Sequence, residues 1–199
     1  MAVAAADRFL GRWIAANAGA EAAGLGTTFV FGRTLAPWLE RMDTAATALG
    51  GAVVAVLLGA LLEGVLVGAA QEGVLRPRLP GMRRGDWVRA SALGAGAAWI
   101  LGMIPSTVMA LQPPDAAAGT PVAPSALVQL LLAAGLGLVT GPVLGSAQWT
   151  VLRRHVQGAG RWLWANALAW AAGMPVIFAG MDLVPWSASP LVVALALYA

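Results

Sequence analysis

The chain has 199 residues, of which 59% are hydrophobic and only 11% are charged, whereas soluble domains carry roughly 25% charged residues. This composition excludes a soluble globular domain, and the lack of cysteine excludes disulfide scaffolds, thiolate metal sites and cysteine nucleophiles. All twelve basic residues are arginine and the formal net charge is only +3, so no nucleic-acid partner is expected.

Five apolar segments are long enough to cross a bilayer, which takes about 20 residues. They span residues 13–35, 45–75, 87–111, 125–152 and 162–184. We therefore predict an all-α integral membrane helical bundle of five transmembrane helices in a single membrane domain, residues 1–199. A short apolar C-terminal segment, residues 190–199, is expected to be re-entrant or interfacial, or the opening of a sixth helix that stops early.

The first segment is the weakest of the five. It is rich in alanine and glycine and contains Asn17 and Glu21, so we expect neighbouring helices to shelter it. The same polar residues, together with the lack of a clear small-x-small cleavage site, argue against a cleaved signal peptide.

Arginine is distributed unevenly between the two sides of the predicted membrane domain. If the N-terminus lies in the cytoplasm, ten arginines fall on the inner side and two on the outer side. An excess of basic residues marks the cytoplasmic side, so this orientation is predicted. The inner residues are Arg8, Arg12, Arg76, Arg78, Arg83, Arg84, Arg89, Arg153, Arg154 and Arg161, and the outer residues are Arg33 and Arg41.

Two short patterns occur more than once along the chain. The pattern Gly-x-x-x-Gly-x-x-Gln-x-x-x-Leu-Arg begins at Gly64 and again 77 positions later at Gly141. The pattern Arg-Trp-x-x-x-Asn begins at Arg12 and at Arg161, with a looser copy at Asp86. Recurrence at a fixed period indicates one structural unit used repeatedly. We predict parallel two-helix repeats over residues 9–76 and 86–154, with a partial third repeat over residues 161–199.

The polar residues of these repeats fall at one depth. Each lies about five residues, or 7–8 Å of helix, inside the arginine that marks the membrane boundary, and Ser91 lies near the same level. Such side chains can hydrogen-bond across a bundle. We interpret them as a structural amide layer; the alternative is that they line a site for a solute or ligand. The set comprises Asn17, Gln71, Ser91, Gln148 and Asn166.

The paired motifs resemble those of an uncharacterised family of small bacterial multi-pass membrane proteins. The residues that carry the resemblance are Trp162, Ala165, Asn166, Gly145, Gln148, Trp149, Leu152, Arg153 and Arg154, with a fainter set in the first half. The resemblance implies a multi-pass architecture and a bacterial cytoplasmic membrane, and it brings no active residues. The chain departs from the pattern where Glu72 replaces the tryptophan and where Glu21 stands opposite Trp170.

Acidic residues inside the predicted spans are candidates for function because their burial is costly. Glu72 stands four residues before Arg76, so we expect an ion pair between them. Glu21 and Glu63 lie deeper, about 13 and 20 Å from the arginines at the inner boundary. Either they are protonated and hydrogen-bonded as structural groups, or they hold an ion, a proton or a ligand.

Other chemistry finds little support in the sequence. A lone histidine, His155, cannot build a multi-histidine metal site or a two-histidine haem site, and no catalytic residues are predicted. The sequence indicates no particular cofactor. Six arginines are candidates for contact with lipid head groups; the alternative is charge that only sets topology. These are Arg76, Arg78, Arg83, Arg84, Arg153 and Arg154.

The function expected from these features is a non-enzymatic accessory subunit that packs within a larger bacterial membrane assembly, against partner proteins or itself. One alternative is a small transporter or channel that uses Glu21 and Glu63. A second is a membrane protein that binds a pigment or a lipid.

Overall fold

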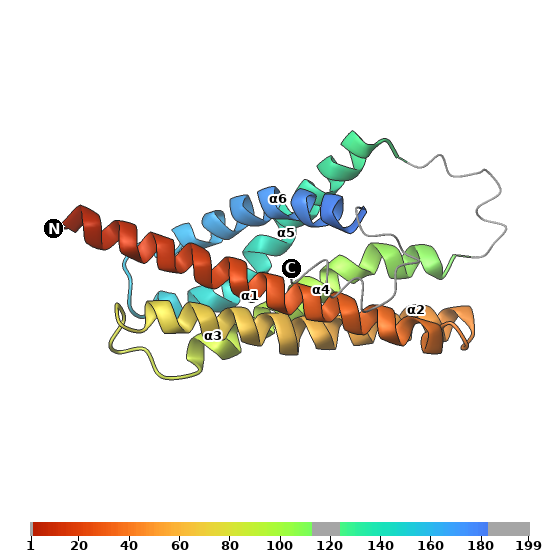
Figure 1. Cartoon of the computed structure of the whole chain (residues 1–199), viewed down its shortest axis with the longest axis horizontal. Helices are drawn as coiled ribbons and strands as arrows, with labels where there is room; N and C mark the ends of the chain where they lie inside the picture. Colours follow the sequence, from red (N-terminus) through yellow and green to blue (C-terminus); the bar gives the residue numbers. More distant parts are fainter. Residues whose placement is uncertain (1, 113–123, 183–199) are drawn as a thin grey trace.

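The computed structural model describes residues 2–112 and 124–182, and within these ranges the chain is helical and contains no strand. This confirms the all-α prediction. The helices in chain order are α1 (Ala2–Leu39), α2 (Thr44–Leu58), η1 (Gly59–Glu63), α3 (Gly64–Leu75), α4 (Asp86–Ala110), α5 (Ala126–Leu152) and α6 (Arg161–Asp182) (Figure 1). The predicted C-terminal segment lies outside the described residues.

Four helical segments are long and apolar enough to cross a membrane. They are Thr44–Leu75, which joins α2, η1 and α3, then Asp86–Ala110, Ala126–Leu152 and Arg161–Gly180. The first expected span lies within α1, which is not among the four because glycines and polar residues such as Asn17, Glu21 and Arg33 lower its hydropathy. The count of five spans therefore stays a prediction.

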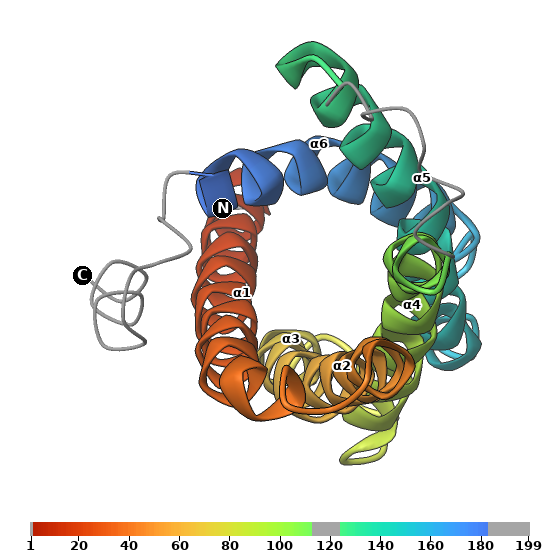
Figure 2. The same cartoon turned by 90° about the vertical axis from the view of Figure 1, so that its right-hand side faces the viewer.

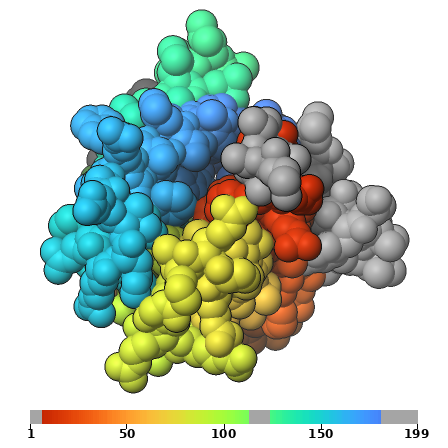
Figure 3. All heavy atoms as spheres, turned by 90° about the vertical axis from the view of Figure 1, so that its left-hand side faces the viewer, coloured from red at the N-terminus to blue at the C-terminus, as the bar shows by residue number. Residues whose placement is uncertain are grey.

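The helices are arranged around a common axis (Figure 2). Packing follows the chain: α1 lies against α3, α3 against α4, α4 against α5, and α5 against α6. The start of α1 and the connections 76–85 and 153–160 lie at one end of the molecule (Figures 1 and 3), which we call the arginine-rich end.

Glycines allow the helices to approach at backbone distance. A Cβ atom on Gly64 would lie 2.7 Å from the Cα atom of Ala92 on α4, and one on Gly141 would lie 2.5 Å from the Asn166 carbonyl oxygen on α6. Real Cβ atoms do not come this close to backbone. Small residues at such positions are typical of helix contacts in membranes.

The most completely buried side chains gather toward the arginine-rich end. Trp87, Ser91 and Gln148 are at most 1% exposed. The ring of Trp162 meets the rings of Trp13 and Trp87 edge to face, with centroids 5.8 and 5.7 Å apart. This geometry is favourable between aromatic rings, so the cluster joins α1, α4 and α6.

The expected ion pair of Glu72 with Arg76 is wrong. Glu72 is buried, and both of its carboxylate oxygens accept from the backbone N–H of Gly85, each at 3.0 Å. The 76–85 connection folds back so that this N–H, at the start of α4, reaches the carboxylate, while Arg76 stays exposed. Through these hydrogen bonds Glu72 connects the end of α3 to the start of α4.

Candidate functional site

Two glutamines connect the helices at the arginine-rich end. Gln71 donates from Nε2 to Asn17 Oδ1 at 2.7 Å, and its Oε1 accepts from Trp87 Nε1 at 2.8 Å. Gln148 donates from Nε2 to Ser91 Oγ at 2.9 Å, and its Oε1 accepts from Trp162 Nε1 at 2.9 Å. Each glutamine thus bridges the two helices on either side of it.

A fifth contact joins the two glutamine bridges, because Gln148 Nε2 also donates to Gln71 Oε1 at 3.0 Å. Asn17 and Asn166 each donate from Nδ2 to the backbone oxygen of the tryptophan four residues earlier, at 2.7 and 2.9 Å. Of the five residues expected in the amide layer, four are linked to each other by side-chain hydrogen bonds. Asn166 is instead packed against the position of Gly145.

The sequence analysis missed the part that tryptophan plays in this network. Trp13, Trp87 and Trp162 were noted there only as part of the repeated Arg-Trp-x-x-x-Asn pattern and its looser copy. A signal was present, since each stands four residues before a member of the amide layer and so shares its helix face. An indole has one N–H donor, and a buried N–H group is almost always hydrogen-bonded to an acceptor.

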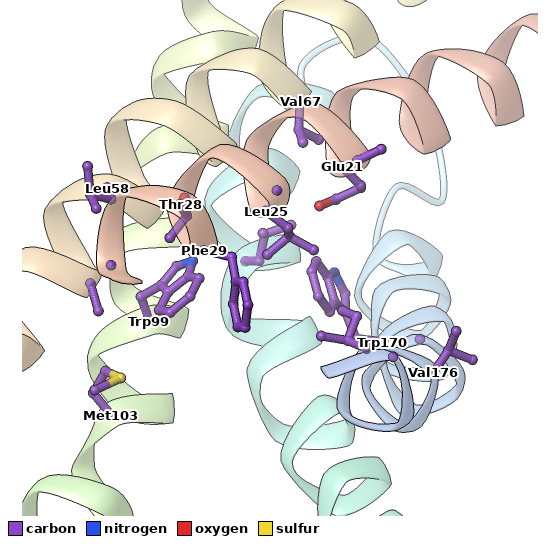
Figure 4. Close-up of a pocket in the computed structure, with 18 of the residues that line it drawn as sticks. Glu21, Leu25, Thr28, Phe29, Leu58, Val67, Trp99, Met103, Trp170 and Val176 are labelled. Carbon is purple, nitrogen blue, oxygen red and sulfur yellow. The ribbon is translucent and has the colours of Figure 1, made fainter. Parts of the chain in front are cut away.

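A cavity of about 1260 Å³ lies between the helices and extends from Trp13 to Leu39 along α1. Its lining is mostly apolar and comes from every helix except the five-residue η1. Figure 4 shows the aromatic side chains of Phe29, Trp99 and Trp170 turned toward the same space. The sequence did not predict this cavity, because it depends on how the helices cross.

Glu21 lies on the wall of the cavity (Figure 4). Its Oε2 atom is buried and, within the described residues, has no hydrogen-bond partner. Thr28, about two helical turns further along α1, also lines the cavity, and its hydroxyl is likewise buried without a described partner. Both groups belong to polar residues in a wall that is mostly apolar.

Glu63 has a different environment from Glu21. It is 4% exposed, does not line the cavity, and accepts from Trp99 Nε1 through Oε2 at 2.7 Å. It ends the π-helical turn η1, and α1 packs directly over it, since a Cβ atom on Gly24 would lie 2.7 Å from the Glu63 Cα atom. The structure therefore does not bring both acids onto the cavity wall.

The six arginines expected to meet lipid head groups are exposed at the arginine-rich end. Two of them lie over aromatic rings: Arg78 over Phe9 and Arg153 over Trp149, each with its guanidinium carbon 4.7 Å from the ring centroid. Such cation–π contacts hold the side chains near the surface while their charges stay in a polar environment.

Among the residues that the structure describes, no group of three or more acidic or histidine side chains is placed to hold a metal ion. Comparison with protein-family models, curated proteins and solved structures finds no match for this chain.

Proposed function

We propose that the chain is a multi-pass subunit of the bacterial cytoplasmic membrane, with its N-terminus in the cytoplasm. In this proposal one transmembrane helix of a partner protein packs against α1 and α6 and lies in the cavity that the six α-helices line. The amide layer and its tryptophan partners then lie near the cytoplasmic side of the bilayer, as the distribution of arginine indicates.

The length of the cavity is the observation that carries this proposal. The stretch of α1 from Trp13 to Leu39 rises about 39 Å, which exceeds the bilayer core of about 30 Å. A long, mostly apolar cavity of membrane depth therefore has the length that a transmembrane helix requires.

The walls beside α1 and α6 suit close helix packing. Ala18 on α1 and Ala165 and Ala169 on α6 are exposed and line the cavity. Helices associate in membranes largely through such small residues, because they allow the backbones to approach. The ring contact of Trp13 with Trp162 joins the two helices at one level, and their backbones do not pack together.

Site-specific photocrosslinking tests the proposal, because the chain has no cysteine and a single introduced one carries the probe. Ala169→Cys places a benzophenone maleimide on the cavity wall. Leu168→Cys is the matched control, since Leu168 is the neighbouring residue on α6, is 66% exposed and does not line the cavity. Both variants are irradiated in native membranes, and the adducts are mapped by peptide mass spectrometry.

The expected result is an adduct from Ala169→Cys, and none from Leu168→Cys, within a transmembrane segment of another chain that co-purifies in fixed stoichiometry. Adducts on lipid alone, on residues 183–199 of the same chain, or at equal yield from both positions would overturn the proposal.

Binding of an apolar, lipid-like molecule is a second candidate function. It is favoured by the part of the cavity in Figure 4, where the rings of Phe29, Trp99 and Trp170 line the same space as Glu21 and Thr28. Such a ligand would pack its apolar body on the rings and hydrogen-bond at its polar end. Organic extraction of the purified protein tests this candidate function. A lipid or pigment should be recovered in stoichiometric amount from the wild type and should be lost in a Glu21→Leu, Thr28→Val variant.

The transporter alternative stays a prediction, and only Glu21 of its two acids lines the cavity.

A further inference from the structure

Three tryptophan–amide pairs recur at the same level of the molecule, on α1, α4 and α6. They are Trp13 with Asn17, Trp87 with Ser91, and Trp162 with Asn166. Gln71 lies between the first pair and the second, donating to Asn17 and accepting from Trp87. Gln148 lies between the second pair and the third, donating to Ser91 and accepting from Trp162. Both glutamine bridges therefore follow the same pattern. Each glutamine donates to the amide or hydroxyl group of one pair and accepts from the indole N–H of the next pair.

The first pair and the third each contribute to the cavity lining a residue that such a bridge would use. Trp13 and Asn166 both line it. Within the described residues, the Trp13 ring makes aromatic contacts while its indole N–H donates no hydrogen bond, and Asn166 uses its amide nitrogen but not its side-chain oxygen in a hydrogen bond. Two residues of the cavity lining thus have one donor and one acceptor available at the level of the two glutamines.

The helix surfaces around these groups follow the same rule. The spacing of the pairs makes Ala165 and Ala169 of α6 equivalent to Ala90 and Gly94 of α4. The α4 residues are buried by neighbouring helices, whereas the α6 residues are exposed to the cavity. On α1, Ala18 is equivalent to Ala167 of α6, which is 1% exposed, yet Ala18 is exposed.

Resting on the proposed function, we infer that the partner helix carries a glutamine at the level of Gln71 and Gln148. Its side-chain oxygen accepts from Trp13 Nε1, and its amide nitrogen donates to Asn166 Oδ1. Small residues three and seven positions before this glutamine pack on α1 near Ala18. They correspond to Gly68 and Gly64 before Gln71, which lie against α4, and to Gly145 and Gly141 before Gln148, which lie against α6.

A carboxamide suits this position because it offers an acceptor and a donor on one neutral group. An ionised carboxylate only accepts hydrogen bonds and is costly to bury in a bilayer. Residues 183–199 of this chain contain neither glutamine nor asparagine, so the bridge is assigned to a separate polypeptide.

The test uses a synthetic membrane peptide of residues 124–154 as the probe helix, because it carries Gln148 with both glycines. The full-length protein in lipid nanodiscs carries a donor fluorophore at Gly160→Cys, where a Cβ atom meets open space, and the peptide carries an acceptor at its C-terminal end. Binding is followed by energy transfer for the native peptide and for Gln148→Leu and Gln129→Leu peptides. Gln129 is exposed near the start of α5, so its change is the matched control.

We expect the native and Gln129→Leu peptides to bind equally and the Gln148→Leu peptide about tenfold more weakly, as two membrane hydrogen bonds predict. In a Trp13→Phe protein, which keeps the ring and loses the N–H, the native peptide should weaken and the difference between the peptides should shrink. A Trp38→Phe protein, changed at an exposed tryptophan of the same helix, should match the wild type.

Equal binding of all three peptides would overturn the assignment of a glutamine while leaving helix docking in place. No binding by any peptide would overturn the inference as a whole. The proposed function would then be tested separately by the Ala169→Cys crosslinking experiment. Energy transfer between two labelled copies of the protein, at the same concentrations, would also overturn it by assigning the cavity to self-association.

Discussion

Gln148 shows how a single polar side chain can fix the packing of a membrane bundle. It is fully buried and contacts Gln71, Ser91 and Trp162, which lie on three other helices. In a bilayer core these groups have no water to bond with, so each depends on the others. The level of Gln148 could be predicted from its distance to Arg153. Its partners could not, because one-dimensional spacing gives depth and not direction.

Replacement of Gln148 by leucine is expected to lower the free energy of unfolding by about 2 kcal/mol, because buried partners lose their hydrogen bonds. Reversible unfolding in mixed detergent micelles, followed by circular dichroism, measures the change. Gln129→Leu on the same helix is the control and should have little effect, since Gln129 is exposed. Equal stability of the two variants would show that the network contributes nothing.

Glu63 is expected to act as a hydrogen-bond acceptor for Trp99. Glu63→Gln keeps an acceptor oxygen and should change the free energy of unfolding little, whereas Glu63→Leu should lower it by about 1–2 kcal/mol by leaving the indole N–H unpaired. The same micelle assay compares the two variants. If Glu63→Gln were as destabilising as Glu63→Leu, the negative charge rather than the acceptor would be the important property.

At the scale of elements, glycine faces set which helices touch. The spacing in a Gly-x-x-x-Gly pattern favours close approach of helices but does not name the partner helix, and the structure assigns Gly64 to α4 and Gly141 to α6. Two other features were beyond the sequence. The π-helical turn η1 lies inside an apolar run whose sequence predicts a regular α-helix. The contact of Glu72 with the Gly85 backbone N–H depends on how the 76–85 connection folds.

Gly141→Ala should separate α5 from α6. The new methyl group would meet the Asn166 backbone at 2.5 Å, and such overpacking costs about 1–3 kcal/mol. Gly135→Ala lies on the same helix with open space around its Cβ position, so its stability should stay within about 0.5 kcal/mol of the wild type, as for surface changes. Thermal unfolding of both variants provides the comparison, and equal losses would contradict the packing described for α5 and α6.

At the scale of the whole molecule, the amino-acid composition indicates a membrane protein, and the distribution of arginine predicts its orientation in the membrane. The helices agree with the predicted apolar segments because long apolar runs are the strongest signal in a membrane sequence. The cavity lay beyond prediction, since it results from the crossing of helices whose faces are all apolar.

Orientation can be tested with single cysteines in a chain that has none. Pro80→Cys lies in the 76–85 connection and Gln112→Cys follows α4, and both positions are exposed. In intact cells from which the outer membrane has been removed, an impermeant maleimide should label Gln112→Cys and reach Pro80→Cys only after lysis. The reverse pattern would contradict the predicted cytoplasmic N-terminus.

The claim on which the account depends is that a partner helix lies against α1 and α6. Electron cryomicroscopy of the protein, purified gently from its own membrane, tests it most directly. We expect helical density of another chain along Ala18, Ala165 and Ala169, with side-chain density reaching Trp13 and Asn166. A map in which this cavity holds only lipid, or in which α1 and α6 pack directly together, would contradict it.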